Sequence, residues 1–567
     1  MAKKTSINNT DMNTISSTKN VGLKGTSREG EVSPCASYKE SATPSPRGKA
    51  PKTPDCHTDS ILLTQNQGNN AIRLATVFSG IGAIEHALDR MNLNHKIVFA
   101  CDNGDVDVLS KKVPEDILEI EKELSELSME ISKINIQSEE DKLYKDELNL
   151  ILSKTNEEVE MYKKMDLQNS SENKINIKIK DICQRTGMLH EKINSFRILK
   201  ELSTLKTWTE KKNLVDSLYK GKEESNKVKK TYMANYDLDS KDFHWNVSFL
   251  DGNQYKDDVD LFVGGSPCQS FSLVGKQRGL ADTRGTLFYE YARLVKEIRP
   301  KIFIYENVKA LLSNDEGRTW ETISKVFTDL DYTWKKAVLN AKDYGIPQNR
   351  ERVFVVGFRK DLELAKEFEF PKPIKLEKKM QDFLIENAPG GYFLPEKGVD
   401  FVTDEKNLTK RYTQIDGEIQ LCQKKNQQFN WHGDFVFQSE NEAKQKIKID
   451  LEKYFLSEKV RKYVLATGTK NFYSRPKTDL EVARPLLTTM HKMHRAGVDN
   501  YVTTDGRLRK LTPRECFRLM GFSDNFKIPV SDTSAYQQAG NSIVVDVLIH
   551  IMESILESYP QLLGENK

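Results

Sequence analysis

Short apolar runs that alternate with segments of helical periodicity are the feature of this sequence that most limits its fold. The runs cover residues 74–78, 97–101, 259–263, 302–305 and 353–356. Helical patterns over 286–298 and 318–330 separate the last three runs. Short buried strands with helices between them are typical of a sheet that is covered on both faces. The pattern therefore predicts an α/β fold built on a parallel, doubly wound sheet.

The charges of the chain nearly balance. Its 567 residues, enough for several domains, include 86 Lys and Arg against 83 Asp and Glu, which gives a net charge of +3. Attraction to nucleic acid depends on where basic residues cluster rather than on their total number. Any site for a polyanion must therefore be a local patch.

Cysteine usage and the distribution of apolar residues exclude two further classes of protein. The seven cysteines include no CxxC pair, so neither a disulfide framework nor a metal site is expected. The N-terminus has no apolar run, and no segment approaches the roughly 18 apolar residues of a membrane span. We expect a soluble, reduced, intracellular protein with no membrane partner.

Three regions interrupt the α/β pattern. Residues 1–70 are rich in Ser, Thr, Asn, Lys and Pro, which predicts a disordered tail. Residues 108–230 carry apolar side chains at heptad spacing between 117 and 134. This spacing predicts a helical hairpin or small bundle, which either binds a partner or packs only on itself. Lys and aromatic residues interleave over 361–505 without regular strand periodicity, which suits either nucleic-acid contact or a small core.

A glycine-containing turn follows the first apolar run. Glycines stand at 80 and 82, but Glu85 occupies the place where a dinucleotide fingerprint needs its third glycine. A carboxylate at that place would repel a diphosphate. Asp102 ends the next run, where an acid can bond both hydroxyls of a ribose. An adenosine cofactor without a diphosphate, such as S-adenosylmethionine, fits both facts, although many turns between a strand and a helix carry glycine for packing alone.

Cys268 lies in a segment, Gly264 to Ser272, that directly follows a buried strand. Ligands of doubly wound folds bind at this edge of the sheet. Pro267 restricts the backbone on either side of it and so holds the cysteine in one orientation. A thiolate displayed there can act as a nucleophile, whereas a lone cysteine is more often a small buried apolar residue.

Glu306 and two arginines follow at later strand ends. Glu306 comes after the run 302–305, where burial would raise its pKa and let it hold a proton near neutrality. Arg350 and Arg352 share one face of an extended segment before the run 353–356. They could hold a phosphate or a carbonyl oxygen, or form a structural ion pair with Glu306.

The order of these segments carries a resemblance. FxGxG is followed by Pro-Cys-Gln, Glu-Asn-Val and Gln-x-Arg-x-Arg, and the series ends in Gln-x-x-Gly-Asn-Ser at 537–542. This order resembles the C5-cytosine-specific DNA methyltransferase family of bacterial restriction-modification systems. The resemblance covers residues 71–107, 229–360 and 506–555, and it implies an S-adenosylmethionine-dependent, Rossmann-like fold.

The resemblance also implies which residues bind the cofactor and which act on the base. The expected cofactor-binding residues are Phe78, Gly80, Ile81, Gly82, Asp102, Asn246, Pro267, Leu287, Asn541 and Ser542. Asp102 and Asn246 depart from the family, which often has Glu at the ribose and an acid at the adenine amino group. The expected catalytic residues are Cys268, Glu306, Arg350 and Arg352, with no metal.

In the implied reaction, the Cys268 thiolate attacks carbon 6 of a cytosine that has been flipped out of duplex DNA. Glu306 acts at N3 and Arg352 at O2 while carbon 5 takes the methyl group. Residues 269–285 resemble a loop that closes over the base. A base, expected to be water, then removes the proton from carbon 5.

The resemblance further implies a domain plan. A catalytic domain over 71–360, completed by 526–567, contains the insertion at 108–230, and a target-recognition domain covers 361–525. The insertion is expected to split one surface helix, with its first half at 103–108 and its second at 228–235, and to have no catalytic part. Double-stranded DNA is the expected partner of a monomeric cytoplasmic enzyme at the nucleoid, together with a cognate restriction endonuclease.

Three alternatives stay open at this point. An RNA cytosine-5 methyltransferase uses the same motifs, although the long 361–505 segment favours duplex DNA. A DNA-binding homologue without activity is a second alternative, against which the retained Cys268 speaks. A nicotinamide oxidoreductase is the third, and the missing third glycine speaks against it.

Overall fold

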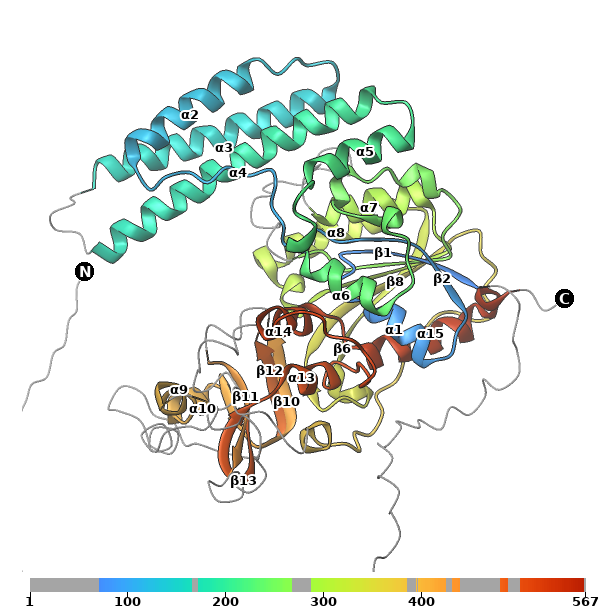
Figure 1. Cartoon of the computed structure of the whole chain (residues 1–567). Coiled ribbons are helices and arrows are strands. Elements are labelled where there is room, and N and C mark those ends of the chain that lie inside the picture. The colour runs from blue at the N-terminus through green and yellow to red at the C-terminus, as the bar shows by residue number, and fades with distance from the viewer. Residues whose placement is uncertain are drawn as a thin grey trace, which may run out of the picture. The chain divides into compact units, whose positions relative to one another are not determined.

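The computed structural model describes residues 71–165, 172–267, 287–384, 394, 396–424, 431–438, 480–487 and 500–564 (Figure 1). The expected tail over 1–70, the expected nucleophile Cys268 and the expected loop over 269–285 lie outside these residues.

A seven-stranded mixed sheet forms the centre of the fold, in the order β3-β2-β1-β4-β5-β8-β6 (Figure 1). All five apolar runs of the sequence are strands. The strands are β1 (Ile72–Val77), β2 (His95–Cys101), β3 (Phe243–His244), β4 (Leu261–Gly264), β5 (Ile302–Val308), β6 (Tyr332–Asn340) and β8 (Glu351–Arg359).

The expectation of a wholly parallel sheet is wrong at one strand. Neighbours from β3 to β5 are parallel, but β8 is antiparallel to both β5 and β6. Between β6 and β8 lie only the helical turn η8 (Ala341–Tyr344) and the short strand β7 (Gln348–Asn349). A parallel return needs a crossover of a dozen or more residues, so the chain turns back on itself here.

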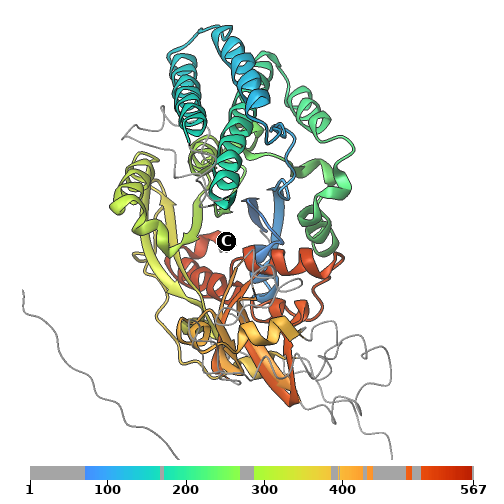
Figure 2. The ribbon, with the colours of Figure 1, turned by 90° about the vertical axis from the view of Figure 1, so that its left-hand side faces the viewer.

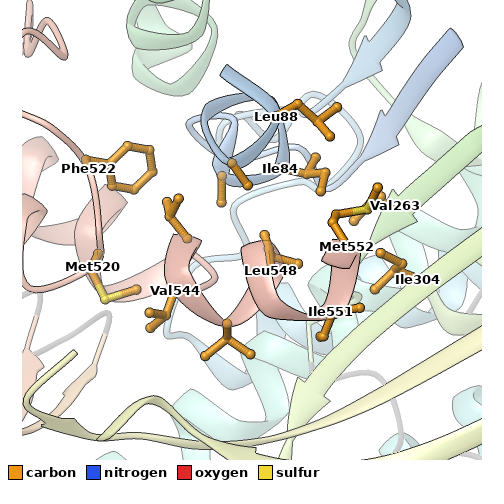
Figure 3. Close-up of a cluster of buried hydrophobic side chains, with 14 of the residues drawn as sticks. Ile84, Leu88, Val263, Ile304, Met520, Phe522, Val544, Leu548, Ile551 and Met552 are labelled. Atoms are coloured by element: carbon orange, nitrogen blue, oxygen red, sulfur yellow. The ribbon is translucent and has the colours of Figure 1, made fainter. Parts of the chain in front are cut away.

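Alternate residues of the inner strands enter two separate cores, because successive strand side chains point to opposite faces. One core packs Leu261 and Val263 against α1 (Ala83–Arg90) and α15 (Val545–Ser558), and Figure 3 shows part of this cluster. The other packs Phe262 against α7 (Leu287–Ile298) and α8 (Arg318–Thr328). The helices expected over 286–298 and 318–330 are confirmed as α7 and α8.

One stretch of the described residues, Asp532–Ser558, is long and apolar enough to cross a membrane by length and composition alone. It includes α14 (Asp532–Asn541) and α15, so the expectation that no segment approaches the composition of a membrane span is wrong for this stretch. Of its apolar window, 61% is buried inside the fold. Leu548, Ile551 and Met552 lie in the first core (Figure 3), so packing accounts for this apolar composition.

Residues between β2 and α6 (Lys227–Asn235) form helices, as the heptad spacing predicts. These are α2 (Ile117–Ser132), α3 (Glu139–Lys163), α4 (Glu172–Thr204) and α5 (Trp208–Leu218). Helices α2, α3 and α4 lie side by side around a core of their own, which includes Ile120, Leu124 and Leu127 (Figure 2).

The expectation that this insertion splits one helix is wrong. The chain after β2 turns at Gly104 and Asp105, whose φ angles are 61° and 60°, and left-handed residues cannot continue a right-handed helix. Helix α6 begins instead at its own N-cap, Asn226, whose side chain accepts a hydrogen bond from the Lys229 amide.

Residues from 394 onward add further short strands and helices, for which the sequence offered no assignment. The helices are α9 (Glu396–Val402), α10 (Glu405–Thr409) and α13 (Pro513–Arg518). The strands are β9 (Thr413–Ile415), β10 (Gly417–Lys424), β11 (Gly433–Gln438), β12 (Leu480–Leu487) and β13 (Asn500–Lys510). They pair in two small groups, β7 with β10 and β12, and β9 with β11 and β13.

Candidate active site

The glycine turn after β1 has an unusual backbone that explains its composition. Phe78, Gly80 and Gly82 all have positive φ angles, of 52°, 55° and 82°. A Cβ at Gly82 would lie 2.2 Å from the Tyr236 ring, whose hydroxyl donates to the Gly82 carbonyl at 2.5 Å. Any side chain at 82 would therefore displace α6 from the turn. Ile81 is buried in the first core.

Asp102 lies against this turn. One oxygen of its carboxylate accepts a hydrogen bond from the Gly80 amide at 2.9 Å, and the other accepts from the Gly104 amide at 2.8 Å. A carboxylate oxygen can accept more than one hydrogen bond. Asp102 can therefore hold the turn in shape and still accept from a ligand hydroxyl at the same edge of the sheet.

Glu85 is not displayed at the turn, contrary to the sequence argument that it repels a diphosphate. Its carboxylate is fully buried and accepts hydrogen bonds from the hydroxyls of Tyr232, at 2.6 Å, and Thr76, at 3.1 Å. Burial raises the pKa of Glu85 above its usual range, and the Tyr232 hydrogen bond partly opposes this. Of the two sequence arguments against a dinucleotide-binding turn, only the missing third glycine is left.

The segment that leads to Cys268 is hydrogen-bonded to β5 through Ser266. The Asn307 side chain donates to the Ser266 carbonyl at 2.9 Å and to the Tyr305 hydroxyl at 2.8 Å, and the Ser266 and Tyr305 hydroxyls lie 2.8 Å apart. Pro267, the next residue, is exposed. Sequence reasoning missed Tyr305 and Asn307, because both belong to a segment that reads as an ordinary buried strand and its end.

Glu306 lies beside this segment and pairs with Arg352. A Cβ at Gly265 would lie 2.9 Å from the Glu306 carboxylate, so a glycine is needed where the two segments meet. Arg352 Nε is 3.1 Å from Glu306 Oε1, and both side chains are largely buried. Burial raises the pKa of Glu306, while the charges of Arg352 and Arg350 partly oppose the rise. The contact between Glu306 and Arg352 that the sequence left open is therefore formed.

Arg350 points elsewhere, although the sequence placed it on one face with Arg352. It is 3% exposed and donates to the backbone carbonyls of Gln423, at 2.7 Å, Gly540, at 3.1 Å, and Ser542, at 2.8 Å. Burial lowers the pKa of Arg350 to about 10, so it remains charged at neutral pH. Its hydrogen bonds join three segments of the chain.

The four remaining expected cofactor residues lie at the ends of three elements. Asn246 follows β3, and the Asp102 amide donates to the His244 carbonyl at 3.1 Å, so these two strand ends are neighbours. Leu287 begins α7 and is partly buried. Asn541 ends α14 and is exposed, while Ser542 is buried. No cluster of three or more His, Cys, Asp or Glu that could hold a metal occurs among the described residues.

Comparisons with known proteins point to the same family as the order of the sequence motifs. The model of the family described as "C-5 cytosine-specific DNA methylase" matches residues 216–557. The type II methyltransferase M1.ScrFI of Lactococcus lactis subsp. cremoris is 34% identical over 330 residues, which is 58% of this chain and 69% of that protein. The type II methyltransferase M.HhaI of Haemophilus parahaemolyticus is 35% identical over 305 residues, or 53% and 76% of the two chains. A solved structure of the S. pombe Dnmt2 methyltransferase aligns with 86% of this chain and 98% of its own, at 15% identity and a TM-score of 0.42.

Proposed function

This chain belongs to the C-5 cytosine-specific DNA methylase family, and we propose that Cys268, Glu306 and Arg352 carry out its methyl transfer to a cytosine flipped out of duplex DNA. The observation that carries the assignment is the Glu306–Arg352 pair beside the segment that leads to Cys268. A carboxyl group and a guanidinium side by side match the N3 and O2 atoms on one edge of a cytosine.

The residues present fit S-adenosylmethionine. Asp102 offers acceptor oxygens to ribose hydroxyls, Asn246 offers an amide oxygen to an amino group, and Phe78, Pro267 and Leu287 add apolar surface. Acceptors together with apolar groups suit an uncharged nucleoside. When bound, the cofactor supplies an electrophilic methyl group. Gly80, Gly82, Ile81, Asn541 and Ser542 complete the proposed set around the turn and the end of α14.

Each catalytic residue has one task on the base. The Cys268 thiolate adds to carbon 6, which makes carbon 5 nucleophilic enough to take a methyl group. Glu306, whose raised pKa favours a retained proton, donates to N3 as the ring gains electrons. Arg352 stabilises the charge that develops on O2. Loss of the proton from carbon 5, with water as the base, then lets the thiolate leave.

Arg350 acts in this scheme through the backbone. It is a positioning residue that ties β7 and β8 to the end of α14 and to β10, by its hydrogen bonds to Ser542, Gly540 and Gln423. We therefore propose a positioning role for Arg350, in place of the expected catalytic role in contact with the base.

Residues 361–525 form the proposed target-recognition domain, with the sequence-reading positions within 390–500. Base edges in the major groove distinguish all four base pairs, and a separate domain can reach them while the catalytic domain holds the flipped base. The type II relatives support a cognate restriction endonuclease as a functional partner. We place the enzyme, as a monomer on DNA, in a bacterial cytoplasm.

Incubation of the purified chain with labelled S-adenosylmethionine and either duplex DNA or transfer RNA tests the function. The digested nucleosides should contain 5-methylcytosine from DNA only. Methylation of RNA alone, or of another atom of the base, would refute the proposal. Bisulfite sequencing of DNA from cells that express the chain would then identify the target sequence.

A further inference from the structure

The C-terminal end of the insertion contacts the two residues proposed to hold the cofactor's nucleoside. Asn226, which is fully buried just before α6, donates from Nδ2 to the Asp102 carbonyl at 2.9 Å. Tyr219, directly after α5, accepts a hydrogen bond on its hydroxyl from Nδ2 of Asn246 at 3.2 Å. Neither contact involves the outer helices α2 and α3.

Tyr219 is held firmly in this position. It is 1% exposed, and its ring stacks on Trp245, with the centroids 4.7 Å apart and the planes 7° apart. Tyr219 and Trp245 belong to a buried cluster at the base of the insertion that also contains Ile198 and Val215. Burial raises the pKa of Tyr219 to about 12, so its hydroxyl stays protonated at neutral pH.

The hydrogen bonds around Asn246 define which way its amide points. Oδ1 accepts from the Ser248 amide at 2.9 Å, while Nδ2 donates to Tyr219. A flipped amide would point its NH₂ group at the Ser248 N–H, which is also a donor. The backbone of this segment is held as well, because Arg293 donates to the carbonyls of Val247, at 2.9 Å, and Leu250, at 3.0 Å.

An amide oxygen with one hydrogen bond keeps a second lone pair for a ligand donor. The family often has an acid at this position, and both oxygens of an acid are acceptors in any orientation. An asparagine is an acceptor on one side only, so its orientation decides whether it can accept from an amino group. The Ser248 N–H, which can only donate, selects this orientation, and the Tyr219 hydroxyl holds the amide in place through Nδ2.

We infer that Tyr219 of the insertion is a positioning residue for cofactor recognition, which holds in place the Asn246 amide that Ser248 orients, so that Oδ1 accepts from the 6-amino group of the adenine. The inference rests on the proposed function, in which Asn246 contacts the adenine. It makes the base of the insertion a part of the nucleoside site, and it replaces the expectation that the whole insertion is passive.

Calorimetry with the full chain and S-adenosylhomocysteine tests the inference without turnover. Tyr219→Phe keeps the ring stacked on Trp245 and removes only the hydroxyl. Because one hydrogen bond to an oriented group is lost, Kd should rise about three- to tenfold. The preference for S-adenosylhomocysteine over S-inosylhomocysteine, which has an oxygen in place of the amino group, should fall by a similar factor. In turnover, KM for the cofactor should rise while kcat stays constant.

Tyr144→Phe is the matched control. Tyr144 is a partly buried tyrosine of the insertion, whose ring stacks on Phe196 at 4.9 Å and whose hydroxyl donates to the Lys192 carbonyl at 2.8 Å. It lies on α3, among the outer helices, so its loss should leave both Kd values unchanged. An equal change of Kd in both variants would show a general effect of the insertion and would overturn the specific role of Tyr219.

The double variant separates positioning from stability. In an Asn246→Ala background, Tyr219→Phe should change Kd no further, because no amide is left to orient. A full additive change there would contradict the inference. Wild-type protein that binds no S-adenosylhomocysteine would refute the proposed cofactor itself, whereas wild-type binding that Asn246→Ala leaves unchanged would refute only the role of Asn246 and Tyr219.

Discussion

Arg352 Nε lies 3.1 Å from Glu306 Oε1, across the antiparallel pair of β8 and β5. The register places Arg352 opposite Val308, two residues beyond Glu306. In the proposed mechanism the pair supplies a donor for N3 and a donor for O2 in one arrangement, so little reorganisation is needed when the base binds.

Glu306→Gln should lower turnover by about 10²- to 10⁴-fold, because a neutral amide cannot supply a proton to N3. S-adenosylhomocysteine affinity should stay within twofold of wild type, since Glu306 is not proposed to contact the cofactor. Glu351→Gln is the control: the Glu351 carboxylate is exposed and pairs with Lys309 at 2.9 Å. Near-normal turnover of Glu306→Gln would remove Glu306 from the mechanism.

The pH dependence of stability should differ between wild type and Glu306→Gln. Burial raises the folded-state pKa of Glu306 above its ordinary value of 4.5, so the folded state holds this proton to higher pH than the unfolded state. Wild type should therefore lose stability relative to the variant as pH rises from about 4.5 through the raised pKa. Urea unfolding from pH 4.5 to 8 would measure this difference, and a constant difference would contradict a raised pKa.

His86 should contribute an opposite dependence on the acid side. It is buried beside Phe522 and accepts from the Ser523 amide at 3.1 Å, and burial lowers its pKa to about 4. Below pH 6.5 the unfolded chain binds a proton at His86, whereas the folded protein does not bind it until about pH 4. The free energy of unfolding should therefore fall by about 2 kcal/mol between pH 7 and pH 5. His86→Gln should lose less over the same range in urea unfolding. Parallel losses in the two proteins would show that His86 is not the titrating group.

The sequence predicted the strands that are buried on both faces and the helices between them, because apolar runs and helical periodicity report burial directly. Strand β6 escaped notice because it lies at the edge of the sheet, where Lys335 and Lys336 interrupt its apolar residues. The direction of β8 was mispredicted because direction depends on the connection rather than on the composition of the strand.

The contacts between side chains of the candidate site were predictable only in part. The positions of Glu306 and Arg352 near strand ends allowed a pair between them as one of several possibilities. The partners of Arg350 were not, because its carbonyl acceptors lie 73, 190 and 192 residues along the chain. The contact of Tyr219 with Asn246 was not predictable either, because Tyr219 belongs to the insertion and Asn246 lies beyond its end.

Removal of the outer part of the insertion should leave cofactor binding intact. The buried cores of α2, α3 and the first part of α4 lie entirely within residues 113–193. Asn194 donates to the Leu109 carbonyl at 2.8 Å, so a short glycine linker can replace 111–193. The base cluster with Tyr219 remains, and Kd for S-adenosylhomocysteine should be unchanged.

A larger deletion, from 105 to 225, removes Tyr219 and should weaken that affinity at least as much as Tyr219→Phe. Equal affinity of the two deletion variants would show that the base of the insertion is dispensable. If the shorter deletion folds and binds cofactor but loses DNA affinity, the outer helices contact DNA.

Exchange of residues 390–500 for the equivalent segment of a related enzyme should change the DNA sequence that is methylated and leave the chemistry alone. Phosphate contacts position a protein on DNA, whereas base contacts specify the sequence. Bisulfite sequencing of DNA from expressing cells would read the new target. An unchanged target would place the specificity in another part of the chain.

Covalent trapping tests the central claim, methyl transfer through a bond between Cys268 and carbon 6, most directly. Duplex DNA that carries 5-fluorocytosine can accept the methyl group but has no proton on carbon 5 to lose, so the thiolate cannot leave. Wild type should form a denaturant-resistant adduct of one protein and one DNA that requires S-adenosylmethionine. Cys268→Ala should form none, yet bind S-adenosylhomocysteine normally. Methylation of ordinary DNA by Cys268→Ala, or an adduct that persists in that variant, would contradict the mechanism.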